Sequence, residues 1–408
     1  MTYQRLQSAL TTDSGNIGPR YLYITRVEHP NEAIYTENLS DFFAELAVPT
    51  REIVMQARGA DRTELAACLA GDARAVLGFN WHLDHSCIGD EHFLHIAAAA
   101  GVPVIQWLVD HPSSIWHRFE HTSAENSCFL FNSGYSEAYF RQFVMPDCRS
   151  ALMAGNTGTS RHSRIAGLTP QAFLARDIKC LLPLNLRRLG GTIEDLDLEI
   201  THLPPRLEQA VRAAIAHAHD DLDHPIEWHF FNNSPPMDLL QISDLFHQCI
   251  RIIEDIVQVR RRLAVLSVAR EFPVLIQSDL AANYLPSVGA AVLESAPTMR
   301  ETLTRIPRAR AIVSLTHVND EIHNRTLNAL NAGAVNIIED NVVHRRFFTH
   351  GKNALLFRYG DDSLRECLDI VCSRPERAYE IAAAGFAMRD DPRLRFAGFH
   401  NLLELARA

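Results

Sequence analysis

The sequence predicts an α/β fold in which two doubly wound, Rossmann-like domains face each other across a cleft, with a largely helical segment between them. Short apolar strands alternate with helices near the start of the chain and again after residue 270. Such alternation indicates parallel sheets, because parallel strands need long helical crossovers. Between the two stretches, apolar residues recur at helical spacing instead.

Length and composition are those of a globular protein with two domains of ordinary size: 408 residues, of which 47% are hydrophobic and 22% charged. No apolar run approaches the roughly 18 residues that span a bilayer, and the polar start of the chain lacks a signal-peptide core, so we expect a cytoplasmic location. The eight cysteines are scattered singly, which predicts reduced thiols. A net charge of −10 argues against a nucleic-acid partner.

Residues 1–165 are predicted to form the first Rossmann-like domain. Its strands are expected where β-branched and aromatic residues cluster, and its helices lie between them. The expected strands are Arg20–Arg26, Arg51–Ala57, Ala73–Asn80, Val102–Val109 and Cys128–Phe131. The expected helices are Glu37–Leu46, Arg62–Leu69, Glu91–Ala100 and Ser136–Phe143.

Residues 166–270 are predicted to be mainly helical, residues 271–385 to form the second Rossmann-like domain, and residues 386–408 to end the chain in a helix. The apolar pattern of the middle segment has helical spacing around Leu207 and again from Leu239 to Val257. The expected strands of the second domain are Val274–Gln277, Ala290–Leu293, Ala311–Leu315, Val335–Ile338 and Ala354–Phe357. The expected helices are Thr298–Arg305, Asp361–Cys372, Pro375–Met388 and Pro392–Ala406.

The stretch Asn319–Asp340 carries the first candidate site. It combines a polar helix start, a glycine stop at Gly333 and a buried strand, and the start of such a helix lies where open parallel sheets bind ligands. Arg325 suits a phosphate, and amide side chains suit sugar hydroxyls. Alternatively, Arg325 only pairs with Glu321 on the surface. The candidate ligand-binding residues here are Ser314, Thr316, Asn324, Arg325 and Asn328.

The second candidate site follows strands of the first domain. Asp110 and His111 come directly after the strand Val102–Val109, and either is suited to act as a general base at the carboxyl edge of the sheet. Alternatively, Asp110 only caps the next turn. Asn80 and His82 follow a neighbouring strand, and Trp116 either stacks on a ligand or packs in the core.

A histidine-rich stretch leaves a metal-site alternative open. Asn80–His85 reads N-W-H-L-D-H, one residue away from the H-x-H-x-D-H signature of metallo-β-lactamase-like zinc hydrolases. Asn80 replaces the first histidine, and no clear downstream ligand segment follows. Because a metal site needs its complete set of ligands, we expect no metal.

The C-terminal third resembles the group 1 glycosyltransferase domains of bacteria, especially those of spore-maturation-protein-like enzymes, which have the GT-B fold. The resemblance rests on four segments that match the family in combination. They are R-T-L-N-A-L-N-A-G-A (Arg325–Ala334), R-F-F-T-H-G-K-N (Arg346–Asn353), L-L-F-R-Y-G-D-D-S-L-R (Leu355–Arg365) and R-P-E-R-A-Y-E-I-A-A-A-G (Arg374–Gly385).

This resemblance implies a hexosyltransferase-type enzyme that moves a sugar from a nucleotide-sugar donor, held by the second domain, to an acceptor held by the first. It adds Lys352 and Asn353 to the donor-binding residues and implies neither a metal nor another cofactor. Asn328 stands where many relatives have a glutamate, so retention or inversion stays open, as does a non-catalytic binding module. The sugar, the nucleotide, the oligomeric state and the acceptor (a glycan, lipid, protein or small molecule) are not predicted.

Overall fold

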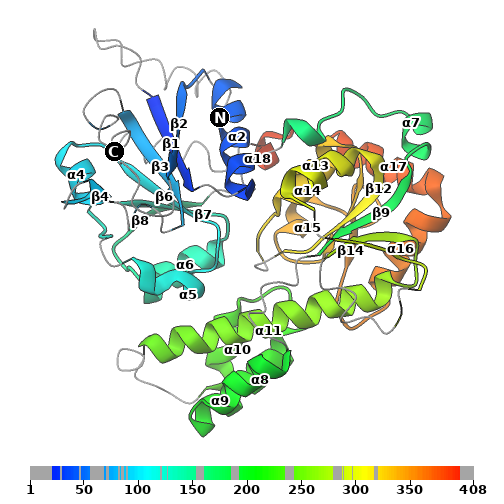
Figure 1. Cartoon of the computed structure of the whole chain (residues 1–408). Coiled ribbons are helices and arrows are strands. Elements are labelled where there is room, and N and C mark those ends of the chain that lie inside the picture. Colours follow the sequence, from blue (N-terminus) through cyan, green and yellow to red (C-terminus); the bar gives the residue numbers. More distant parts are fainter. Residues whose placement is uncertain are drawn as a thin grey trace. The chain divides into compact units, whose positions relative to one another are not determined.

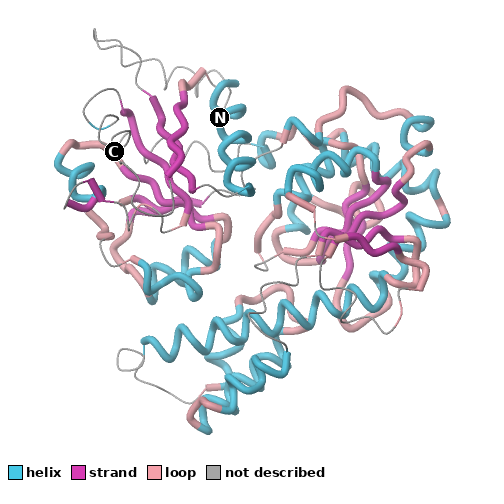
Figure 2. Tube along the Cα trace, in the orientation of Figure 1, coloured by secondary structure: helices cyan, strands magenta, loops and turns pink. Residues whose placement is uncertain are grey.

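The computed structural model of the chain divides into two compact units, which are described separately. The first comprises residues 1–160 and 395–408, and the second comprises residues 161–394. The structure describes residues 21–27, 30–45, 47–55, 69, 73–80, 83, 87–88, 91–119, 122–125, 127–152, 160–184, 193–234, 243–278, 287, 289–295, 297–316 and 320–395. Figure 1 gives the element labels, and Figure 2 shows the strands as two separate groups with helices around them.

The first unit contains a six-stranded parallel sheet with the order β2-β1-β3-β6-β7-β8. Its central strands are buried on both faces and consist largely of aliphatic and aromatic residues, as expected for a sheet covered on both sides. The strands are β1 (Tyr21–Val27), β2 (Thr50–Met55), β3 (Ala73–Phe79), β6 (Val104–Leu108), β7 (Cys128–Phe131) and β8 (Arg149–Leu152).

Helices cover this sheet, and short elements connect its strands. Helix α2 packs on a core that includes Phe43, Phe79 and Trp107, whereas α4 packs on a separate core around Phe93. The helices are α2 (Pro30–Glu45), α4 (Phe93–Ala99), α5 (Pro112–Ile115), η1 (Trp116–Arg118) and α6 (Gly134–Phe143). A small hairpin pairs β4 (Cys87–Ile88) with β5 (Glu91–His92).

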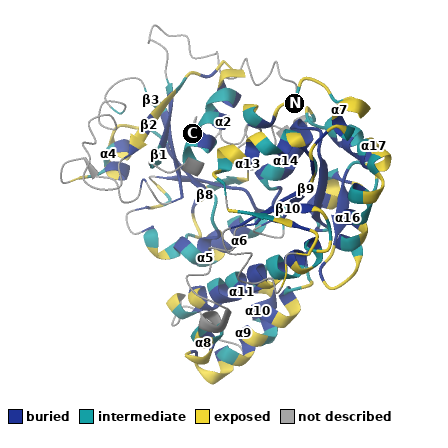
Figure 3. Ribbon diagram, turned by 45° about the vertical axis from the view of Figure 1, so that its right-hand side comes forward, coloured by how far each residue is buried: buried dark blue, intermediate teal, exposed yellow. Residues whose placement is uncertain are grey.

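The second unit contains another six-stranded parallel sheet, with the order β11-β10-β9-β12-β13-β14. This is the strand order of a doubly wound dinucleotide-binding fold. Figure 3 shows much of this sheet as buried. The strands are β9 (Ile178–Pro183), β10 (Val274–Gln277), β11 (Val292–Glu294), β12 (Ala309–Ser314), β13 (Val335–Glu339) and β14 (Leu355–Phe357).

The helices around this sheet share one large core with its strands, and that core also contains the C-terminal end of α11. Helix α13 begins with a capping box, in which Thr298 and Glu301 bond each other's backbone N–H groups. The helices are η2 (Arg161–Ser163), α7 (Pro170–Leu174), α13 (Met299–Arg305), η4 (Ile306–Arg308), α14 (Asn324–Asn331), α15 (His344–Phe347), α16 (Ser363–Ser373), α17 (Pro375–Phe386) and α18 (Pro392–Arg395).

A helical insert fills the crossover from β9 to β10. It consists of α8 (Ile193–Thr201), α9 (Pro205–Ala218), α10 (Ile226–Asn233) and α11 (Ser243–Ala269). With 27 residues, α11 is about 40 Å long. Its C-terminal end packs on the sheet, and its N-terminal part extends beyond the sheet to carry the other three helices (Figure 1).

The observed elements confirm the predicted fold class, two parallel sheets with helices. They differ from the sequence prediction in several places, and helix α2 begins at Pro30 instead of Glu37. Strand β9 lies at the centre of the second sheet, within residues 166–270, where only helices were predicted. Strand β8 was not predicted, and the helix predicted to begin at Glu91 begins at Phe93 because Glu91–His92 pairs in the hairpin. The predicted helix Arg62–Leu69 and most of Pro392–Ala406 lie outside the described residues.

None of the helices within the described ranges combines the length and apolar character needed to cross a membrane.

Candidate functional site

The strand order of the second sheet identifies where a ligand is expected to bind. From β9 the chain moves to β10 and β11 on one side and then returns to β12 on the other, so the order reverses between β9 and β12. Ligands of open α/β sheets bind at the carboxyl ends of the strands at such a switch point. Helix α14, which follows β12, begins at this edge and ends at Gly333, whose φ of +58° favours glycine.

Arg325 lies at this switch point. The His323 side chain caps α14 by accepting a hydrogen bond from the Arg325 backbone N–H at 3.1 Å. The Arg325 guanidinium is half-buried, and its Nη1 donates to the carbonyl oxygen of Pro183, the last residue of β9, at 3.1 Å. A cation and a helix N-terminus therefore meet at the edge between β9 and β12, which is an arrangement suited to a phosphate.

Ser314 and Thr316 make hydrogen bonds inside the unit at the same edge of the sheet. The backbone N–H and Oγ1 of Thr316 each donate to Glu339 Oε2 at 2.7 Å, and Tyr359 Oη donates to Glu339 Oε1 at 2.8 Å. Burial raises the pKa of the Glu339 carboxyl, and the hydrogen bonds from Thr316 oppose that shift. Ser314 is fully buried and accepts a hydrogen bond from Thr326 at 3.3 Å. These contacts fix the ends of β12 and β13 together.

Asn324 and Asn328 are buried inside the unit. Asn328 Nδ2 donates to the Asn324 carbonyl oxygen at 2.7 Å, and Asn328 Oδ1 accepts from Ser163 Oγ at 2.5 Å. Their exposed fractions are 2% for Asn324 and 0% for Asn328. Through these bonds Asn328 connects α14 to η2, and the donor-binding role of Asn324 and Asn328 stays a prediction.

Lys352 and Asn353 are not brought together with Arg325. They lie in the turn before β14, whose first residue Leu355 pairs with Ile337 in the middle of β13, so the turn lies toward the amino ends of the strands. Lys352 is exposed, while Asn353 Oδ1 accepts from the Thr349 backbone N–H at 2.7 Å. The end of the segment Arg346–Asn353 is thus a tight turn at the amino edge of the sheet, opposite the edge where α14 begins.

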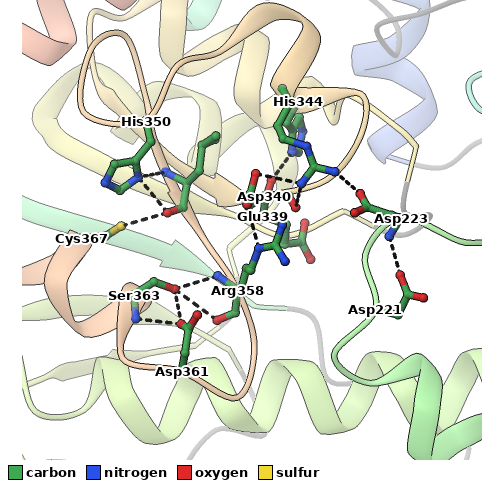
Figure 4. Close-up of polar contacts among 12 residues, drawn as sticks. Asp221, Asp223, Glu339, Asp340, His344, His350, Arg358, Asp361, Ser363 and Cys367 are labelled. Carbon is green, nitrogen blue, oxygen red and sulfur yellow. Dashed lines mark hydrogen bonds and ion pairs between the residues drawn. The ribbon is translucent and has the colours of Figure 1, made fainter.

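The helical insert is attached to the carboxyl edge that carries Arg325. Arg345 donates to Asp340, at the end of β13, and pairs with Asp223 in the loop before α10. Arg358, after β14, also pairs with Asp340 at 2.8 Å. Figure 4 shows Asp340 next to Arg358 and the loop of Asp221 and Asp223 on the other side of this cluster.

The buried guanidinium of Arg261 attaches the helical insert to the sheet at a second place. Arg261, in α11, donates to the carbonyl oxygens of Ala218, His219 and Asp221, and it lies over the ring of Tyr359 at 5.3 Å from the ring centroid. Arg261 therefore joins α11, the end of α9 and Tyr359, the second residue after β14. The printed contacts therefore attach the insert to the sheet next to the ends of β13 and β14.

The first sheet has its own switch point, between β1 and β3. Asn80, directly after β3, has a left-handed backbone with φ of +49°, a conformation that is uncommon for residues other than glycine and often found at functional sites. Its Nδ2 donates to Asp110 Oδ2 at 2.9 Å, and its Oδ1 accepts from the Val109 backbone N–H at 2.9 Å. Asn80 thereby holds the half-buried Asp110 carboxylate at the end of β6.

His111 and Trp116 lie beyond Asp110. His111 is only 4% exposed, and its Nδ1 caps α5 by accepting from the Ser113 backbone N–H at 3.2 Å. Its ring packs against Tyr139, with the ring centroids 4.9 Å apart. This buried capping geometry suits a structural histidine better than a general base. Trp116 is half-buried at the start of η1, and His82 lies outside the described residues.

Glu32 belongs to the same edge and was missed by the sequence analysis. It lies in the first turn of α2, and its Oε2 accepts from the Val27 backbone N–H at the end of β1 at 2.9 Å. Burial, with a smaller contribution from the Asp110 carboxylate, raises the pKa of Glu32 to about 7. The sequence shows an acidic residue just after the first predicted strand, which could have pointed to Glu32. Its raised pKa, however, depends on burial, which arises only from tertiary packing.

Asn132, at the end of β7, is a further polar residue at this edge of the first sheet. Trp107 Nε1 donates to its Oδ1 at 2.8 Å, and its buried Nδ2 has no hydrogen-bond partner among the described residues. Glu32, Asn80, Asp110 and Asn132 therefore follow four strands of the sheet at one edge. Within the described part of the chain, no group of three or more His, Cys, Asp or Glu residues is arranged to hold a metal ion.

Comparison with known proteins agrees with this architecture. Residues 285–401 match the model of a glycosyl transferase-like family, whereas no curated protein matches the sequence. An alpha-glucosyltransferase in complex with UDP is similar over 95% of this chain and 100% of that chain, with 9% identity and a TM-score of 0.55. An alpha-glucosyltransferase with UDP and a 13-mer DNA gives 10% identity, coverage of 96% and 100%, and a TM-score of 0.51. The family match covers part of the second unit, and the two similar structures show that this chain shares the fold of these glucosyltransferases.

Proposed function

We propose that the protein transfers a sugar from a nucleotide-sugar donor, bound by the second unit, to a hydroxyl group of an acceptor bound by the first. The observation that carries this proposal is the position of Arg325, a guanidinium at the N-terminus of α14 and at the switch point between β9 and β12. The similar alpha-glucosyltransferases were solved with UDP, which makes a UDP-sugar the first donor to test.

On the donor side, the chemistry requires stabilisation of a leaving diphosphate. As the bond between the anomeric carbon and the diphosphate oxygen breaks, negative charge grows on that oxygen. The α14 N-terminus and Arg325 would stabilise this charge, because both are fixed before the reaction begins. We therefore infer that turnover needs no divalent cation.

On the acceptor side, Asp110 is the proposed general base. Its carboxylate would take the proton of the acceptor hydroxyl while the hydroxyl oxygen bonds to the anomeric carbon. Asn80 fixes the orientation of this carboxylate, and Glu32 adds a second carboxyl with a pKa of about 7, close to the value that suits general catalysis at neutral pH. The buried Nδ2 of Asn132 has no hydrogen-bond partner among the described residues, and in this proposal it donates a hydrogen bond to the acceptor.

Titration calorimetry with UDP-glucose, GDP-glucose and dTDP-glucose tests the donor half of the proposal, and release of free nucleotide in the presence of EDTA tests turnover. A non-catalytic binding module would bind a nucleotide sugar without releasing nucleotide, even with a range of acceptors. The class of acceptor remains to be found. Because the chain has a net charge of −10, we predict that the acceptor is not a nucleic acid.

A further inference from the structure

Gln277, the last residue of β10, lies next to the residue that Arg325 contacts. The parallel register pairs Gln277 with Pro183 on β9, and the Leu184 backbone N–H donates to the Gln277 carbonyl oxygen at 2.9 Å. The Pro183 carbonyl oxygen accepts the hydrogen bond from Arg325 Nη1. Because neighbouring strands lie about 4.8 Å apart, Gln277 ends one strand away from the place proposed for the diphosphate.

The Gln277 side chain points to the face of the sheet on which α14 packs. Ile276 and Val313 belong to the large core on the other face, which also contains the end of α11. Successive side chains of a strand point to opposite faces, so Gln277 on β10 and Ser314 on β12 leave that core. Ser314 accepts a hydrogen bond from Thr326 of α14 at 3.3 Å. Gln277 therefore shares its face of the sheet with the helix that carries Arg325.

The amide group of Gln277 has one atom bonded and one unbonded. Its Nε2 donates to Glu294 Oε2, at the end of β11, at 3.3 Å, and Glu294 also pairs with Arg305 of α13. A carboxylate only accepts hydrogen bonds, so this contact turns the amide nitrogen toward Glu294. Gln277 is 2% exposed, and its Oε1 is buried with no hydrogen-bond partner among the described residues. Because an unbonded buried acceptor is costly, this position favours a ligand that donates a hydrogen bond.

The strand order indicates which part of the donor this oxygen meets. In a nucleotide sugar, the diphosphate is bonded to the sugar on one side and to the ribose on the other. In doubly wound dinucleotide-binding folds, an acceptor side chain of the first βαβ unit bonds a ribose hydroxyl. Strands β9 and β10 form that unit in the second sheet, and Gln277 ends its second strand. The oxygen of the predicted amide Asn328 already accepts from Ser163, whereas Gln277 Oε1 is unbonded.

Building on the proposed function, we propose that Gln277 Oε1 accepts a hydrogen bond from a ribose hydroxyl of the nucleotide-sugar donor. The pair of Glu294 and Arg305 holds the amide in the orientation that this bond needs. A deoxyribose that lacks the bonded hydroxyl leaves the buried oxygen without a partner. Gln277 therefore makes the donor site select ribonucleotides, while Arg325 and the α14 N-terminus hold the diphosphate.

The test compares UDP with 2′-deoxy-UDP and 3′-deoxy-UDP, each of which lacks one ribose hydroxyl, by titration calorimetry of the full chain. We expect one of the two deoxy analogues to bind about tenfold more weakly than UDP, or weaker still. The reason is that a site built to bond a hydroxyl loses both the hydrogen bond and the pairing of its own buried atom when the hydroxyl is absent.

Gln277→Met assigns this discrimination to Gln277, because the methionine side chain has a similar length but lacks the amide oxygen. The variant should bind UDP and the disfavoured deoxy analogue with affinities within about twofold of each other. Gln209→Met is the matched control, because Gln209 is exposed on α9, and it should keep the wild-type ratio. Circular dichroism of both variants checks folding, and Gln277→Leu provides a second variant if Gln277→Met unfolds.

The outcomes separate this inference from the proposed function. If the wild type binds UDP and both deoxy analogues equally well, the ribose contact is overturned and the donor site stands. If UDP and both analogues fail to bind, the proposed UDP-sugar donor is overturned together with the inference that rests on it. A preference for UDP that persists unchanged in Gln277→Met shows that another residue reads the ribose, and it contradicts the role of Gln277.

Discussion

The Arg325 guanidinium donates a hydrogen bond to the carbonyl oxygen of Pro183 at 3.1 Å, which joins the start of α14 to the end of β9. The two residues are 142 positions apart in sequence, because the whole helical insert lies between β9 and β10. This contact places a cation at the point where the strand order reverses, and it is the structural basis of the proposed donor site.

Arg325→Ala should weaken donor binding, because it removes a charged hydrogen-bond donor from the proposed diphosphate site. We expect an increase of about tenfold to a hundredfold in the Kd of UDP-glucose, as hydrogen bonds to charged groups contribute about 1.5–3 kcal/mol. Calorimetry measures this effect. Arg374→Ala is the control, since Arg374 lies on the surface and pairs with Asp369. Equal affinity in both variants would exclude Arg325 from the donor site.

Asp110→Asn should separate catalysis from donor binding. The amide keeps the size of the side chain but cannot take a proton, so turnover should fall by about 10² to 10⁴ while the Kd of the donor is unchanged. Nucleotide release in the presence of an acceptor measures the rate. Asp147→Asn serves as the control, because Asp147 is exposed before β8 begins. A variant that retains wild-type turnover would rule out Asp110 as the base.

The pH profile of turnover should report Glu32. Its pKa is raised to about 7, so the carboxyl gains a proton as pH falls through 7. If the ionised pair of Glu32 and Asp110 is needed to accept a proton, kcat/KM should decrease below about pH 7 and reach a plateau above it. Glu32→Gln should remove the midpoint near 7. An unchanged acid limb in this variant would show that Glu32 does not contribute.

Glu227 should make the second unit less stable as pH rises. The pKa of its buried carboxyl is about 8 in the folded chain, against 4.5 in the absence of burial. The folded state therefore binds more protons than the unfolded state between these values, and stability decreases from about pH 4.5 to 8, by up to about 5 kcal/mol.

Glu227→Gln removes the titrating carboxyl group and should make the free energy of unfolding less dependent on pH. Urea unfolding of the full chain at about pH 5.5 and 8.5, followed by circular dichroism, measures it. The surface variant Glu208→Gln should keep the wild-type difference between the two pH values. The same difference in Glu227→Gln would contradict the burial of an ionisable carboxyl at this position.

The sequence predicted those parts of the fold that depend on local pattern. Alternating strands and helices gave both Rossmann-like domains, because buried parallel strands are apolar runs and their crossovers are helical. Strand β9 was missed because I-K-C-L-L-P is a short apolar run that ends in proline and has no distinctive period. Its place at the centre of the sheet follows from pairing with β10 and β12, which are about 90 and 130 residues away.

In the candidate site too, the residues proposed from the sequence follow a local pattern, and the residues that were missed depend on tertiary packing. Arg325 and Asp110 were proposed because each follows a predicted strand, and the carboxyl ends of parallel strands share an edge. Lys352 and Asn353 come from a family-like pattern, and their position before β14 depends on the register with β13. Glu32 and Glu227 escaped notice because the feature that distinguishes them, a carboxyl buried beside other carboxylates, arises from tertiary packing.

The central claim is that the second unit binds a nucleotide sugar at the N-terminus of α14. Titration calorimetry of the full chain with UDP-, GDP- and dTDP-glucose tests it most directly. The account predicts saturable binding of at least one of these donors in the wild type and in Asp110→Asn, with clear weakening in Arg325→Ala. If none of the three binds with a Kd below about 1 mM, roughly 4 kcal/mol of binding free energy, the nucleotide-sugar account is contradicted.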